Sequence, residues 1–121
     1  SDLQNQISLV KKFLHVRSLA SVDGNEMMTE ARLLLQMPEV ESAVRIGDIY
    51  GTMIECLASQ SQYQQAYDVM QEMREWNRSV NMVFYVNMAT ITAIHERLGI
   101  PMGSGKGAEG EEGDIEEDLG P

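Results

Sequence analysis

The sequence predicts an all-α fold in which about five amphipathic helices stack as the end of an α-solenoid. The central observation is a hairpin from about Ser42 to Asn77, whose arms 46–59 and 63–76 repeat apolar residues every three or four positions. A short polar break at 59–62 joins the arms, which favours an antiparallel pair. The apolar run 80–86 has no helical period, but it has no second strand with which to pair.

The second arm of this hairpin carries a tetratricopeptide-like signature. An aromatic, a small residue and two packing residues occupy the positions expected of that repeat's second helix; they are Tyr63, Ala66, Met70 and Met73. The first arm matches the repeat less closely. We therefore interpret the hairpin as a degenerate tetratricopeptide-like unit, which buries its apolar faces by stacking on neighbouring units.

Two further helices are predicted before the hairpin. The first covers about 2–20 and carries two adjacent apolar stripes, a width that indicates contact with more than one neighbour. These stripes are Ile7, Val10 and Leu14, and beside them Leu9, Phe13 and Val16. The second helix extends to about Gln36, with Asp23 or Asn25 as its N-cap.

The sequence also predicts how the central hairpin begins and packs. Pro38 ends the preceding helix and is suited to open the next one, since proline is tolerated in the first helical turn. Within that helix, Ala43, Gly47 and Gly51 recur every four residues. A glycine inside a helix costs roughly 1 kcal/mol relative to alanine. Two in one turn indicate a neighbouring backbone too close for a Cβ atom, and packing partners on two sides.

The C-terminal part divides into a connector, a helix and an acidic end. We expect 80–86 to lie extended over the helices, and Asn87 to cap a last helix at 88–98. Gly99 and Pro101 mark its end. The sequence thus predicts a helical-repeat domain over 1–101 and a Gly/Glu-rich tail over 102–121, which carries too few apolar residues to offset its ordering entropy and should be disordered.

The charge distribution narrows the classes of partner. The formal net charge is −10; residues 1–101 hold 12 acidic and 8 basic side chains, and residues 102–121 hold 7 acidic residues and one lysine. Nucleic-acid binding requires a surplus of lysine and arginine, so an acidic chain disfavours it. No apolar run is long enough for direct membrane insertion. The tail could instead dock on a basic partner through Ile115 and Leu119.

The sequence offers no constellation for catalysis, a cofactor or a metal. His15 and His95 are its two histidines, and the position four after His95 is Gly99, which removes the second ligand of a zinc-protease helix. Zinc requires at least three protein ligands. Cys56 is the single cysteine; it fits a reducing compartment and is expected to be a small core residue. We therefore expect no enzyme, no cofactor and no metal.

Candidate partner-binding residues lie at the end of the hairpin and in the connector. Tryptophan and arginine are enriched in interface hot spots, and here a tryptophan lies between two arginines. Alternatively, the tryptophan packs under the connector and the methionines fill the core. The candidates are Arg74, Trp76, Arg78, Met82, Phe84 and Tyr85.

Several stretches together resemble the intraflagellar transport protein 140 family over about residues 27–101. The most specific are RIGDIYG at 45–51, QQAY at 64–67 and the stretch 93–101. The resemblance implies a non-enzymatic scaffold at the end of an α-solenoid. It further implies a ciliary location, partners among the helical-repeat and WD40 subunits of intraflagellar transport complex A, and a role in retrograde transport and receptor import. The hairpin also resembles pentatricopeptide RNA-binding repeats, against which the acidic charge argues.

Overall fold

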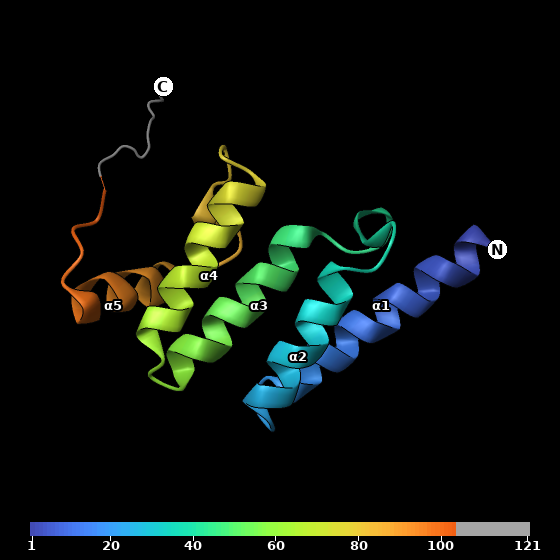
Figure 1. Cartoon of the computed structure of the whole chain (residues 1–121), viewed down its shortest axis with the longest axis horizontal. Helices are drawn as coiled ribbons and strands as arrows, with labels where there is room; N and C mark the ends of the chain where they lie inside the picture. The colour runs from blue at the N-terminus through green and yellow to red at the C-terminus, as the bar shows by residue number, and fades with distance from the viewer. Residues whose placement is uncertain (104–121) are drawn as a thin grey trace. The chain divides into compact units, whose positions relative to one another are not determined.

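The computed structural model describes residues 1–103, which form α-helices and two short 3-10 turns, with no strand among them (Figure 1). The predicted all-α, tetratricopeptide-like fold of about five helices is confirmed. Two compact units divide the chain at residues 91 and 92. The predicted tail lies outside the described residues from 104 onward. The elements are α1 (Asp2–Leu19), α2 (Gly24–Leu35), η1 (Val40–Ser42), α3 (Ile46–Ser59), α4 (Tyr63–Trp76), η2 (Met82–Phe84) and α5 (Met88–Leu98).

Helices α1 and α2 form the first hairpin, and each begins with a side-chain cap. Ser1 and Gln4 form a capping box at the start of α1. At the start of α2 the Asp23 carboxylate accepts a hydrogen bond from the Glu26 N–H at 3.0 Å, so Asp23 and not Asn25 is the N-cap. The two helices pack through fully buried side chains, namely Leu9 and Val16 of α1 and Met27, Ala31 and Leu34 of α2.

The prediction that Pro38 opens the central helix is wrong. Glu39 adopts a left-handed conformation, with φ at 62°, and η1 follows it. A residue with this φ cannot continue a right-handed helix, and Val40 and Val44 on the far side of it are both buried in the core. Helix α3 begins only at Ile46, so the predicted small-residue stripe loses Ala43, which lies outside the helix.

Helix α3 is the centre of the first unit, because α2 lies on one side of it and α4 on the other (Figure 1). The predicted packing on two sides is therefore confirmed. Its buried side chains cover most of its circumference, which explains why the arm is so apolar. They include Ile49, Tyr50, Met53, Ile54, Cys56 and Leu57.

Tyr85, the residue that follows η2, packs directly against Gly47 and Gly51 of α3. A Cβ atom on Gly47 would lie 2.5 Å from the Tyr85 ring, and one on Gly51 would collide with the Tyr85 carbonyl oxygen. The inference of a close backbone thus holds at Gly51, whereas at Gly47 the neighbour is a side chain. The connector lies over α3 as predicted, and it contains a 3-10 turn.

The two 3-10 turns repeat one backbone pattern at positions 40–44 and 82–86. In η1, the Ala43 and Val44 N–H groups both donate to the Val40 carbonyl, at 3.1 and 2.9 Å. In η2, the Tyr85 and Val86 N–H groups both donate to the Met82 carbonyl, at 3.0 and 2.9 Å. A helix follows each turn, α3 after η1 and α5 after η2, so the same backbone pattern precedes both of these helices.

Helix α5 has defined ends. Asn87 caps it by accepting a hydrogen bond from the Ala89 N–H at 3.1 Å. At the other end Gly99 has a φ of 68°, its N–H donates to the Glu96 carbonyl, and the Ile100 N–H donates to the His95 carbonyl at 3.0 Å. These two bonds form a Schellman motif, so the predicted stop at Gly99 is confirmed.

Candidate interaction surface

Two of the six candidate residues hold the connector against α3. Met82 is 8 % exposed and anchors η2 in the core. Tyr85 covers Gly47 and Gly51, and the Arg45 guanidinium lies 5.7 Å from the centroid of its ring. Neither side chain presents its whole surface to a partner, so both serve to position the connector.

Three exposed apolar side chains lie in the connector and at the start of α5. Phe84 is 74 % exposed, and Val83 and Met88 are also exposed. We call Val83, Phe84 and Met88 the connector ridge. Val83 and Met88 were not among the sequence-derived candidates. Val83 lies in a segment without helical periodicity, which does not show which residues face outward, and Met88 is the first residue of α5.

Trp76 lies at the end of α4 and is half-exposed. Its ring centroid is 5.9 Å from that of Tyr50 in α3, with the planes tilted by 40°. The Tyr50 hydroxyl donates to the Glu72 carboxylate at 3.3 Å, and Arg32 of α2 donates to the same carboxylate oxygen at 2.6 Å. One carboxylate thus connects α2, α3 and α4 beside the tryptophan.

The flanking arginines differ in their surroundings. Arg74, half-buried on α4, donates to the side-chain amide oxygen of Gln71. Arg78 lies beyond the helix end and is exposed. Of the six candidates, therefore, Phe84, Trp76 and Arg78 offer the most surface, and Met82 and Tyr85 support it.

A second exposed apolar surface lies on α1. Sequence reasoning identified the stripe and predicted a neighbour for it, but among the described residues it stays open to solvent. Exposed large apolar side chains in a contiguous stripe mark interaction sites more often than isolated ones do. The predicted stripe of Ile7, Val10 and Leu14 is exposed, and Leu3, which was not part of the prediction, extends it toward the start of α1.

The comparison with known families agrees with these repeated hairpins. A family model for the C-terminal tetratricopeptide (TPR) domain of intraflagellar transport protein 140 matches residues 1–74, which is more than half of the chain. The chain belongs to this family. The match includes α1, α2, α3 and most of α4, so the hairpins that carry the α1 stripe and the Tyr50 contact are parts of this C-terminal TPR domain.

The polar network of the TPR domain shifts the protonation of Tyr50. Burial raises the pKa of the Tyr50 hydroxyl above its ordinary value of 10.0, and the neighbouring Glu72 carboxylate raises it further. Burial also raises the pKa of the Cys56 thiol, whose sulfur donates to the Ala20 carbonyl at 3.3 Å. Both groups are therefore held in their neutral forms.

The Tyr50 shift predicts a loss of stability at alkaline pH. The folded protein holds this proton more tightly than the unfolded chain does. The stabilising contribution is therefore fully present below about pH 10 and is lost as the pH rises through the higher folded-state pKa. Urea denaturation of wild type and Tyr50→Phe at pH 7 to 11.5 should show the stability difference shrinking above about pH 10. Parallel pH profiles for the two proteins would contradict the assignment.

Metal-ligand clusters and membrane-spanning helices are both absent from the described residues. Within residues 1–103, no group of three His, Cys, Asp or Glu side chains is close enough to hold a metal ion. None of the five helices in this range is long and apolar enough to cross a membrane. His15 is exposed on α1, whereas His95 is buried, with its Nδ1 atom 3.1 Å from the Ile100 carbonyl oxygen.

Proposed function

We propose that the chain is a non-enzymatic scaffold segment that makes subunit contacts in intraflagellar transport complex A, on the cytoplasmic side of the ciliary membrane and at the basal body. Membership of the family of C-terminal TPR domains of intraflagellar transport protein 140 supports this proposal. Its partners would be other helical-repeat and WD40 subunits of that complex. The retrograde transport and receptor import implied by the family resemblance would follow from this assembly role.

The connector ridge carries the proposal. Met82 and Val86 fix the connector from inside, while the Glu55 carboxylate accepts hydrogen bonds from the Asn87 N–H at 2.6 Å and the Thr90 hydroxyl at 2.7 Å. The connector is therefore held in one conformation on both sides of Phe84. An aromatic side chain presented on a fixed backbone binds with little further loss of conformational entropy.

Affinity capture from ciliated cells tests this function. The tagged chain is compared with Phe84→Ser, which removes an exposed ring without touching the core, and with Trp76→Ala. Because hot-spot truncations cost about 2 kcal/mol or more, recovery of complex A subunits should fall at least about tenfold for Phe84→Ser. Val22→Ser is the matched control, since Val22 is an exposed apolar residue in the α1–α2 turn. Equal recovery with all variants would refute the proposal.

The pentatricopeptide-like alternative gives the opposite result in a binding assay. An RNA-binding repeat should bind single-stranded RNA tightly at low salt and lose affinity steeply as salt rises. With 12 acidic and 8 basic side chains in residues 1–101, we expect no such binding. Tight, salt-sensitive retention of RNA on a filter would favour the RNA-binding function over the scaffold.

A further inference from the structure

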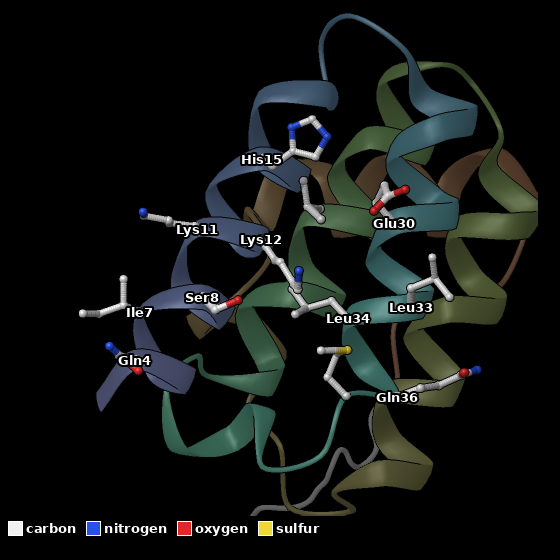
Figure 2. A pocket seen from close by; sticks show the side chains of 12 residues that line it. Gln4, Ile7, Ser8, Lys11, Lys12, His15, Glu30, Leu33, Leu34 and Gln36 are labelled. Atoms are coloured by element: carbon white, nitrogen blue, oxygen red, sulfur yellow. The ribbon is translucent and has the colours of Figure 1, made fainter. Parts of the chain in front are cut away.

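A groove of about 900 Å³ runs between α1 and α2, apart from the connector ridge (Figure 2). Helix α1 supplies polar and basic side chains to it, and α2 supplies leucines and Glu30. Val16 and Leu34 form its buried floor. At its edges Ile7 and Leu33 are 45 % and 53 % exposed, so apolar surface continues from the floor to the rim.

The groove joins the exposed stripe on α1. Lys11 lies four residues after Ile7 and three before Leu14, so it is on the stripe's side of the helix. Figure 2 shows the Lys11 side chain directed away from α2 and that of Lys12 directed toward α2. Lys11 thus lies beside the α1 stripe, and Lys12 lies over the groove.

The charges of this surface are unusual for the chain. Within residues 1–103, Lys11 and Lys12 make no ion pair, whereas Arg32 and Arg45 are paired with Glu72 and Asp48. The chain as a whole is acidic, with a formal charge of −10. Lys12 over the apolar groove and Lys11 beside the adjoining stripe outnumber the one carboxylate of the groove, Glu30, and therefore favour a partner that combines carboxylates with apolar side chains.

The geometry favours a helical partner over an extended one. The described residues contain no strand, so no sheet edge is present there for strand addition. The α1 residues that line the groove extend from Gln4 to Val16, which at 1.5 Å per residue gives about 18 Å, or a little more than three helical turns. An amphipathic helix could place its apolar side on the groove and its acidic flank against the lysines.

We propose that the α1–α2 groove is a docking site for an acidic amphipathic helix of a partner protein. This proposal adds to the scaffold function the chemistry of one partner surface. It rests on the scaffold function only in the assumption that the partner is a protein. RNA would satisfy the lysines, but the apolar floor gives its backbone nothing to bind.

Fluorescence anisotropy with a synthetic peptide tests the site on the full chain. The probe is a labelled helical peptide of about 16 residues, with leucines along one face and glutamates beside them. One control peptide has the same composition with the leucines scattered around the helix, and another has lysine in place of glutamate. We expect binding of the first peptide and at least about tenfold weaker binding of both controls.

Variants of the chain then locate the contact. Lys11→Glu with Lys12→Glu should weaken binding of the glutamate peptide at least about tenfold and improve binding of the lysine peptide. Leu33→Ser should weaken the binding of both the glutamate peptide and the lysine peptide, because it removes half-exposed apolar surface at the rim. Arg78→Glu and Val22→Ser, which lie outside the groove, should change affinity less than about twofold. Circular dichroism melting confirms that each variant is folded.

Several results would overturn the proposal. Equal affinity of the charge-reversed and wild-type chains for the glutamate peptide would remove the lysines from the site. Tighter binding of a single-stranded RNA than of the peptide, lost on charge reversal, would assign the groove to nucleic acid. Self-association that Leu33→Ser abolishes would identify a second copy as the occupant. Peptide binding that appears only in a variant ending at Gly103 would identify the chain's own acidic end. None of these results depends on capture of complex A subunits.

Discussion

Replacing Gly51 with leucine should lower the free energy of unfolding by about 3 kcal/mol, at the upper end of the cost of overpacking a core. The Cβ atom alone would collide with the Tyr85 carbonyl oxygen, which is part of the backbone and cannot turn away as a side chain can. The connector would have to leave α3, and the buried anchor Met82 would move with it. Urea denaturation measures the loss, which corresponds to a melting temperature lower by roughly 15 °C in a domain of this size.

Gly47 provides a matched control on the same helix. A Cβ atom there would meet the Tyr85 ring, which can rotate, and alanine gains roughly 1 kcal/mol of helix propensity over glycine. Gly47→Ala should therefore cost clearly less than Gly51→Ala. In a double-mutant cycle, Tyr85→Ala should relieve the cost at Gly47 and leave the cost at Gly51. Equal stability of Gly51→Leu and wild type would show that the connector does not pack on α3 in solution.

The glycine positions show how far sequence reasoning extends. Two glycines four residues apart predicted a close approach to the central helix, and the structure has one. The identity of the neighbour could not be predicted, because Tyr85 lies in a segment without periodicity more than thirty residues away. Local spacing determines which face of a helix is buried, but long-range contacts depend on how hairpins stack.

The error at Pro38 has a specific physical cause. Proline is favoured in the first turn of a helix, and this local preference predicted an early start for the central helix. Burial of Val40 and Val44 outweighs that preference, since the 3-10 turn directs both side chains inward. Buried residues four apart recur at Met82 and Val86 around the second 3-10 turn. This spacing also fits an α-helix, so it could not have separated η1 from α3 in the sequence.

The interaction candidates were chosen by residue type, which does not show orientation. Within one 3-10 turn, Met82 points into the core and Phe84 is the most exposed residue of the connector ridge. Trp76 is half-exposed, and its ring makes a tilted contact with that of Tyr50. The α1 stripe was predicted as an apolar surface with a neighbour, and its pairing with Lys11 and Lys12 across a groove required the position of α2.

Replacing Met53 with alanine should cost about 2–5 kcal/mol, the range for truncating a fully buried methionine. Met53 is 0 % exposed and lies on the central helix, to which both neighbouring helices pack, so a cavity there would weaken contacts to both. Met88→Ala is the control, since Met88 is 53 % exposed and its truncation should change stability by less than about 0.5 kcal/mol. Thermal and urea denaturation of the two variants measure the difference.

The methionine pair also distinguishes a well-packed core from an adaptable one. Flexible thioether side chains can fill a gap, and Met70 and Met73 of α4 are fully buried like Met53. If they move into the space left by Met53→Ala, the cost will fall below about 1 kcal/mol and the double variant Met53→Ala/Met70→Ala will cost more than the sum of the single ones. That result would contradict a rigid core. It would indicate that the packing between the helices can adjust to different partners.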